Sequence, residues 1–297
     1  MAVTYGPEDL KEIPKRPAYS NKGSFGHVLV AAGSENMCGA AYLSALAAYR
    51  TGAGLVKILT LEANRQILQT LLPEAIISTY CPEQLMEGRQ EFRGMIEREM
   101  NWADVVVLGP GLGSGPYVEY LVEDILTSAF VPVIIDADGL NAIAAHPYLT
   151  TYYTENIIIT PHLGEMARLV GDSIDHIKGD LPQTARQYAM RYGITCVLKD
   201  AATVAAGKDG ALFINSSGNS AMAKAGSGDV LTGIIAGLMA IGMEEEKAAF
   251  MGVYLHGLTG DTAASGKPHS LLARELAGAV GEAMNMRKRN DRQEERT

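Results

Sequence analysis

A run of small residues before an aspartate is the clearest chemical signal in the sequence. Gly226-Ser227-Gly228 directly precedes Asp229, and an apolar stretch follows up to about Ile241. The stretch predicts a helix that starts at the small residues, where unpaired backbone N–H groups and about half a positive charge favour an anion. We therefore expect a phosphate site here. Asp229 is either a base that takes a proton from a substrate or the N-cap of the helix, and the local sequence leaves both open.

The elements that must position this site alternate along the chain. Short β-branched runs alternate with Ala- and Leu-rich helical patterns, which is typical of an α/β fold with a central, mostly parallel sheet and helices on both faces. We expect strands over residues 27–32, 55–60, 75–80, 104–108, 131–136, 156–160 and 195–198. We expect helices over residues 37–51, 116–127, 164–170 and 183–192, and a helical C-terminal third over 230–241, 244–264 and 271–286. The runs 105–108 and 157–159 are apolar at every position, which predicts central strands buried on both faces.

Length and composition narrow the class of protein. The 297 residues, 47% of them apolar, suit one domain over residues 1–297, with an N-terminal extension over 1–20 and a charged tail over 287–297 that we expect to be frayed. The net charge of −9 disfavours nucleic acid as a partner. Three scattered cysteines predict neither disulfides nor a zinc site. No signal peptide or membrane span is evident, so we expect a cytoplasmic protein.

In an open parallel sheet, ligands bind beyond the carboxyl ends of the strands. Two expected strands end in loops of small residues, over 33–41 and 109–115. Glycines there let a ligand approach the backbone, although a plain turn is the alternative for the second loop. Asp136 and Asp138 follow another strand, and either a metal site or helix capping would explain them.

His162 and Lys199 are candidate ligand-binding residues at the same edge. His162 follows a buried strand and stands three residues before Glu165, a place that favours a ligand contact over a purely structural histidine. Lys199 ends the next strand, where its amine suits phosphates and Thr203 adds a hydroxyl, although an exposed lysine is usually only a solvated charge. The chain has neither a GxGxxG turn nor a GxxxxGK[ST] loop. The set predicts a site for phosphate transfer from a nucleotide, not for hydride transfer.

The motifs resemble those of the NAD(P)H-hydrate dehydratase family in order and spacing. They extend from about residue 20 to about residue 284, and the most specific lie at residues 160–165 and 225–233. The others lie at residues 22–30, 39–41, 51–56, 109–113, 136–141, 198–199 and 215–219. The resemblance implies a ribokinase-like fold. It also implies a repair reaction that uses ADP or ATP to restore NADH or NADPH from forms hydrated at ring carbon 6.

The resemblance implies roles for single residues. Asp229 would be the base that activates the ring hydroxyl for attack on the terminal phosphoryl group, and the backbone N–H groups of Gly226, Ser227 and Gly228 would stabilise the charge that grows there. The nucleotide would contact Lys199, Asp200, Ala201, Ala202, Thr203 and Gly228. The hydrated dinucleotide would contact Ala40, Gly111, His162 and Asp229. A divalent cation, Mg2+, would accompany the phosphates, with ligands that the sequence does not identify.

Several points stay open at the level of sequence. The resemblance favours ADP over ATP without a residue that proves it, suggests a homotetramer, and does not distinguish the NADH from the NADPH form. Many family members carry an epimerase domain ahead of this one. This chain has no room for it, so we expect that activity to be encoded elsewhere or the epimerisation to be spontaneous.

Two other classes of function compete with the dehydratase. A small-molecule kinase of the same fold, similar to hydroxyethylthiazole kinase, would use the same glycine and aspartate residues and stop at the phosphate ester, and the fold alone does not separate the two. A non-catalytic nucleotide-binding module is the other alternative, but it would not need a carboxylate beside a phosphate site. The loops 109–113 and 160–165 suit a large dinucleotide better than a small alcohol and so favour the dehydratase.

Overall fold

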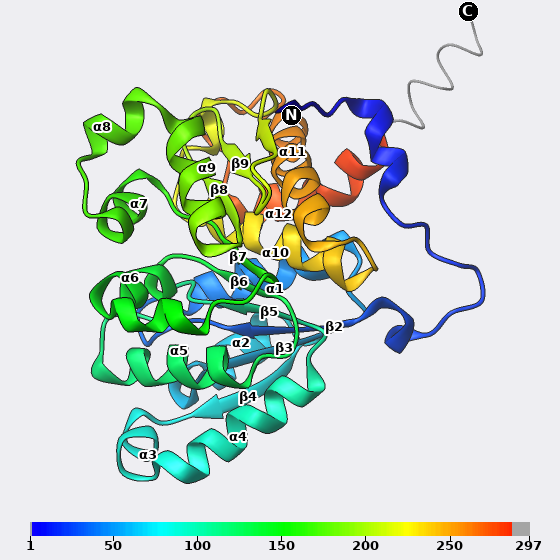
Figure 1. The fold of residues 1–297 in the computed structure, drawn as a ribbon. Helices are drawn as coiled ribbons and strands as arrows, with labels where there is room; N and C mark the ends of the chain where they lie inside the picture. Colours follow the sequence, from blue (N-terminus) through cyan, green and yellow to red (C-terminus); the bar gives the residue numbers. More distant parts are fainter. Residues whose placement is uncertain (1, 287–297) are drawn as a thin grey trace, which may run out of the picture.

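A ten-stranded sheet forms the centre of the computed structural model, which describes residues 2–286 (Figure 1). The strands are β1 (Ala2–Val3), β2 (His27–Ala31), β3 (Leu55–Leu61), β4 (Ile76–Tyr80), β5 (Val105–Leu108), β6 (Val133–Ile135), β7 (Ile157–Ile159), β8 (Thr195–Leu198), β9 (Val204–Ala206) and β10 (Leu212–Ile214). They lie in the order β1-β10-β9-β8-β7-β6-β5-β2-β3-β4. All pairings are parallel except those that β9 makes with β8 and β10, which confirms a mostly parallel sheet.

Helices cover both faces of this sheet, as predicted. They are α1 (Cys38–Thr51), α2 (Arg65–Leu71), α3 (Pro82–Glu87), α4 (Arg89–Trp102), α5 (Pro116–Ser128), α6 (Asp138–Ala145), α7 (Leu163–Val170), α8 (Ile174–Gly179), α9 (Leu181–Tyr192), α10 (Ser227–Ala240), α11 (Glu245–Ala263) and α12 (Ala273–Met284). Short 3-10 helices lie at Pro7–Glu12, Lys22–Phe25, Glu62–Asn64, Pro147–Tyr152 and Ser220–Met222, the last labelled η5. Figure 1 shows α4 to α6, cyan to green, on the opposite side of the sheet from α10 to α12, yellow to red. No helix of residues 2–286 is long and apolar enough to cross a bilayer.

Successive side chains of the strands enter two different cores. In β2, Val28 and Val30 pack with buried residues of α1, α2, α10, α11 and α12. Leu29 and Ala31 point the other way and pack with buried residues of α3 to α9. Alternate residues of a strand face opposite sides of a sheet, so the consecutive apolar runs of the central strands fill both cores.

Helices α1 and α10 approach each other at backbone distance. A Cβ on Gly233 would lie 2.2 Å from the carbonyl oxygen of Ser44, and one on Gly237 would lie 2.5 Å from Cβ of Thr51. The hydroxyls of Ser44 and Thr232 are 3.2 Å apart across the same contact. The absence of side chains at the two glycines therefore allows this contact, which holds the N-terminal ends of both helices at one edge of the sheet.

The sequence prediction missed several short elements. All seven expected strands are present, but β1, β9 and β10 were not expected, and each has only two or three residues. Helices α2, α3, α4 and α8 were also not expected, although α4 has 14 residues, and no range was given for α6. The N-terminal extension adds β1 to the sheet, and the Tyr5 ring packs edge-on against Phe213 with 5.2 Å between ring centroids. The expected frayed tail over 287–297 lies outside the described residues.

Candidate functional site

The loops that follow the central strands meet at the carboxyl edge of the sheet, as predicted. The backbone N–H of Gly33, after β2, donates to the Pro110 carbonyl, after β5, at 2.8 Å. The N–H of Lys199, after β8, donates to the Pro161 carbonyl, after β7, at 2.8 Å, and His162 and Lys199 form an isolated parallel bridge. These bonds hold the expected ligand-binding segments side by side.

Residues 226–229, which we term the phosphate loop, form the start of α10. Gly226 is the N-cap and adopts φ +92°, a left-handed conformation that a side chain would disfavour. Asp229 is the third residue of the helix, so the interpretation of Asp229 as the N-cap is wrong. The N–H of Ser227 donates to the Lys224 carbonyl at 3.3 Å, whereas among residues 2–286 no acceptor faces the N–H groups of Gly228 and Asp229. Of the expected N–H groups, that of Gly228 is thus free for an anion and that of Ser227 is partly engaged, while the N–H of Asp229 is a free donor that was not expected.

Lys199 forms a buried ion pair beside this loop. Its Nζ donates to Oδ1 of Asp136 at 2.5 Å, and the side chains are only 19% and 2% exposed, so Lys199 is not a solvated surface charge. A Cβ on Gly228 would lie 3.2 Å from Lys199 Nζ and 3.6 Å from Asp136 Oδ2. Burial alone would lower the pKa of Lys199, but the nearby carboxylates, Asp136 foremost, raise it, so the amine stays charged.

Asp229 lies within the field of this pair. Burial and the negative charge of Asp136 raise the pKa of Asp229 to about 6, and the charge of Lys199 opposes the rise. No hydrogen bond from the described residues reaches its carboxylate. A carboxylate with this pKa is ionised at neutral pH and still basic enough to accept a proton, which is what a general base requires.

Asp136 and Asp138 serve different contacts because the backbone turns sharply between them. Ala137, the N-cap of α6, adopts φ +49° and ψ −116°, a strained conformation for a residue with a side chain. Asp136 reaches Lys199, while Oδ2 of Asp138 accepts the N–H of Gly113 at 2.8 Å. Neither carboxylate caps α6, and Asp138 instead fixes the glycine-rich loop after β5.

Ala40 and Gly111, both expected to contact the dinucleotide, pack against each other. Gly111 adopts φ +63°, and a Cβ there would be 2.9 Å from Cβ of Ala40. Tight packing against α1 therefore explains one glycine of the 109–115 loop. Ala40 and Gly111 are therefore neighbours in the structure, and their contact with a dinucleotide stays a prediction.

His162 is the N-cap of α7 and is not a core histidine. Its Nδ1 accepts the N–H groups of Gly164 at 2.9 Å and Glu165 at 3.3 Å, and its side chain is 54% exposed. Burial and the charge of Lys199 lower the pKa of His162, so the ring is neutral and carries its proton on Nε2, 3.1 Å from Oε1 of Glu165. Burial raises the pKa of Glu165 to about 7. The exposed ring leaves a ligand contact open at this position.

The remaining residues expected at the nucleotide form the connection from β8 to β9. Asp200, Ala201 and Ala202 are exposed, and the Thr203 carbonyl accepts the N–H of Asn215 at 2.9 Å.

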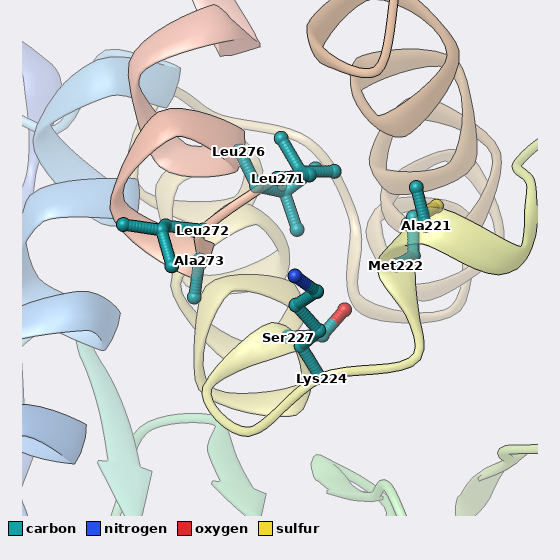
Figure 2. A pocket seen from close by; sticks show the side chains of 8 residues that line it. All are labelled: Ala221, Met222, Lys224, Ser227, Leu271, Leu272, Ala273 and Leu276. Atoms are coloured by element: carbon teal, nitrogen blue, oxygen red, sulfur yellow. The ribbon is translucent and has the colours of Figure 1, made fainter. Parts of the chain in front are cut away.

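Figure 2 shows a pocket close to the phosphate loop, with Ser227 and Lys224 on one side and a mostly apolar lining from η5 and the start of α12. Its lining residues are Ala221, Met222, Lys224, Ser227, Leu271, Leu272, Ala273 and Leu276.

Sequence reasoning missed the partner of one residue near the phosphate loop and missed another residue entirely. Asp136 had no assigned partner, although its place after a central strand was noted. His256, on α11, lies with Nε2 3.3 Å from Oγ of Ser227. It stands within an apolar helical run 29 positions away from Ser227, and no local pattern distinguishes it from a core residue.

Sequence comparisons identify relatives of the chain. Residues 28–280 match a family model described as NAD(P)H-hydrate dehydratase. The bifunctional NAD(P)H-hydrate repair enzyme of Moorella thermoacetica is 41% identical over 255 residues, 85% of this chain and 48% of that protein. The ADP-dependent (S)-NAD(P)H-hydrate dehydratase of Bacillus subtilis is 35% identical over 268 residues, 89% of this chain and 91% of that protein. The chain thus spans about half the length of the bifunctional relatives and most of the length of the ADP-dependent one.

Solved structures agree with these relatives. A ribokinase-like superfamily protein from Enterococcus faecalis superposes with a TM-score of 0.84 at 29% identity, covering 96% of each chain. The ADP/ATP-dependent NAD(P)H-hydrate dehydratase from Bacillus subtilis, co-crystallized with ATP/Mg2+, gives a TM-score of 0.81 at 32% identity, covering 95% of this chain and 97% of that one. The fold is ribokinase-like, as the family resemblance implied.

The buried ion pair gives a prediction about stability. Lys199→Met removes the cation and leaves Asp136 charged and unpaired, which we expect to lower the free energy of unfolding by about 3–5 kcal/mol. Adding Asp136→Asn removes the stranded charge, so the double variant should lose much less than the sum of the two single variants. Urea unfolding of the four proteins measures this coupling.

A surface pair provides the control for this cycle. Lys208 and Glu155 are exposed and 2.7 Å apart, so Lys208→Met should change stability little. Additive losses in the Lys199 and Asp136 cycle would contradict the assignment of a coupled buried pair.

Proposed function

The chain belongs to the NAD(P)H-hydrate dehydratase family, and from this premise we propose that it restores NADH or NADPH from their 6-hydroxylated forms by using a nucleotide. One observation carries the proposal. Asp229, with its pKa raised to about 6 by burial and Asp136, stands in the phosphate loop next to backbone N–H groups without acceptors among residues 2–286. A pure binding site for phosphate gains nothing from such a carboxylate, whereas a phosphoryl acceptor must lose its proton to a base there.

The proposed reaction has two steps. Asp229 takes the proton of the ring hydroxyl, whose oxygen bonds to the terminal phosphorus of ADP while AMP leaves. The lone pair of the ring nitrogen then expels phosphate from carbon 6, and loss of a proton from the neighbouring ring carbon restores the dihydropyridine. The phosphate ester is needed because hydroxide is a poor leaving group and phosphate a good one.

The phosphate loop and Lys199 supply the electrostatic part of this mechanism. The N–H groups of Gly228 and Asp229 and the dipole of α10 face the position where charge accumulates on the phosphoryl oxygens. Lys199 adds a positive charge that its ion pair with Asp136 holds beside Gly228. These groups are fixed before the nucleotide binds, so little reorganisation is needed during the reaction.

Mg2+ fits this site as a companion of the nucleotide. Among residues 2–286 no group of three or more His, Cys, Asp or Glu residues is arranged to hold a metal. Mg2+ commonly keeps several waters and binds substrate phosphates with one or two carboxylates, and Oδ2 of Asp136 lies beside the phosphate loop. When bound, the ion would neutralise phosphate charge, with Asp136 as the protein group that holds it.

The two half-sites follow the roles that the resemblance implies. We assign the adenine nucleotide to Lys199, Thr203 and the segment between them, and the hydrated dinucleotide to Ala40, Gly111 and His162. The names of the Bacillus subtilis and Neisseria meningitidis relatives support ADP as the co-substrate. A cytoplasmic location and a homotetramer stay predictions from the sequence.

An assay with hydrated NADH and each nucleotide tests the function. A dehydratase consumes ADP or ATP in step with the recovery of absorbance from reduced nicotinamide. A kinase of the same fold would consume nucleotide without that recovery, and a binding module would consume none. Either of the last two results would overturn the proposal.

Asp229→Asn tests the base. The substitution keeps the size of the side chain and removes its basicity, so we expect turnover to fall by about 10²–10⁴. Asp209→Asn, at an exposed turn, is the matched control. Turnover above about a tenth of the wild-type value would show that Asp229 is not the base.

The change in stability caused by Asp229→Asn can also be predicted. The folded-state pKa of Asp229 lies above the ordinary value, so the folded protein binds the proton more tightly than the unfolded chain does. The protonated Asp229 side chain contributes its full stabilisation below the ordinary carboxyl pKa, and this contribution is lost as the pH rises through the folded-state pKa of about 6. Relative to wild type, Asp229→Asn should therefore gain stability between about pH 4 and 6, as measured by urea unfolding at several pH values.

His162 tests the dinucleotide half-site. His162→Asn keeps a side-chain acceptor for the N-terminus of α7, whereas His162→Ala loses it and should destabilise the fold by about 0.5–2 kcal/mol. Both variants should weaken binding of NADPH, used as a product mimic, by about three- to tenfold, with ADP affinity unchanged. Calorimetric titrations and thermal unfolding separate the two effects. Normal NADPH affinity in His162→Asn would remove His162 from the pocket.

A further inference from the structure

His256 lies beside the phosphate loop, and the proposed mechanism gives it no role. Its Nε2 is 3.3 Å from Oγ of Ser227, the first residue of α10. Helix α11, which carries His256, packs directly against α10. The contact thus joins the middle of one helix to the first turn of another.

Ser227 belongs to the loop where the phosphoryl group is expected to bind. It precedes Gly228 and Asp229, and Figure 2 shows it at the wall of the adjoining pocket. Within residues 2–286, His256 is the one hydrogen-bond partner of this hydroxyl. A serine hydroxyl rotates readily, so its direction depends on that partner.

The imidazole is suited to fix this direction. Burial lowers the pKa of His256 to about 4, with the charge of Lys199 adding to the fall and a contact with the Ser227 backbone opposing it, so the ring is neutral and has one donor and one acceptor nitrogen. Phosphate oxygens only accept hydrogen bonds from protein groups. The Ser227 hydroxyl can donate to phosphate when Nε2–H donates to Oγ, but it cannot when Nε2 accepts the hydroxyl proton.

We propose that His256 is a positioning residue, which donates from Nε2 to Ser227 and thereby directs the serine hydroxyl to the transferring phosphoryl group. The inference rests on the proposed function for the identity of that group. Helix α11 also contacts the segment that leads to η5 and the phosphate loop. Its Tyr254 carbonyl accepts the Ser217 hydroxyl at 2.8 Å, and Asp261 accepts the N–H of Gly218 at 2.9 Å.

A double-mutant cycle tests this role. Ser227→Ala and His256→Leu should each lower kcat/KM for ADP by about three- to tenfold, the effect of one hydrogen bond. If His256 acts through the hydroxyl, His256→Leu should have less than about a twofold further effect in the Ser227→Ala background. If the fold-loss of kcat/KM in the double variant equals the product of the two single losses, the proposal is overturned.

A conservative variant separates positioning from packing. The amide of His256→Gln can donate near the position of Nε2, so this variant should recover most of the activity that His256→Leu loses. Thr262→Ala, elsewhere on α11, is the control for changes in the helix and should retain wild-type activity. Equal losses in His256→Gln and His256→Leu, accompanied by equal falls in melting temperature, would show a packing role and overturn the proposal.

The same variants also distinguish a failure of the positioning role from a failure of the proposed function. If the wild-type protein shows no nucleotide-dependent recovery of reduced nicotinamide, the proposed function has failed. Calorimetry of ADP binding to the same four proteins then tests the coupling alone. Non-additive losses of ADP affinity support the positioning role, and additive losses overturn it.

Discussion

The ion pair of Lys199 and Asp136 sets the electrostatics of the whole site. Both charges are largely removed from water, so removing either one would leave the other buried without a partner. Together they contribute little net charge, yet Asp136 faces Asp229 closely enough to help raise its pKa while Lys199 limits the rise. Burial is the largest cause of the raised pKa of Asp229, and the opposing charges of Asp136 and Lys199 then add to that rise and limit it.

The backbone turn at Ala137 directs Asp136 and Asp138 to different partners. Its left-handed conformation sends Asp136 to Lys199 and Asp138 to Gly113, although the two acids are separated by a single residue. Strain of this kind persists where the surrounding structure requires it. The same turn therefore supports the electrostatics of the nucleotide side and the shape of the glycine-rich loop near Ala40.

The sequence predicted the parts of this site that depend on local signals. Apolar runs located the central strands, the rule that ligands bind beyond the carboxyl ends of strands located Lys199 and His162, and the small residues before an apolar helix located Asp229. Contacts between distant segments were not predictable in this way. The N-cap role of His162 depends on its side-chain rotamer, the pairing of Asp136 depends on strand order, and His256 reads as one more residue of a buried helix. Strands β9 and β10 lack the runs of Val and Ile that marked the equally short strands β6 and β7.

The backbone contact between α1 and α10 has a mechanical consequence. Helices that interlock through long side chains can slide by exchanging rotamers, but Gly233 and Gly237 bring main chain against main chain and leave no such freedom. The beginnings of α1 and α10, near Ala40 and Asp229, consequently behave as two points on one rigid body. In the proposed reaction, the separation between the ring carbon and the attacked phosphorus would then be set by the scaffold, and movements that admit or release ligands would occur in the surrounding loops.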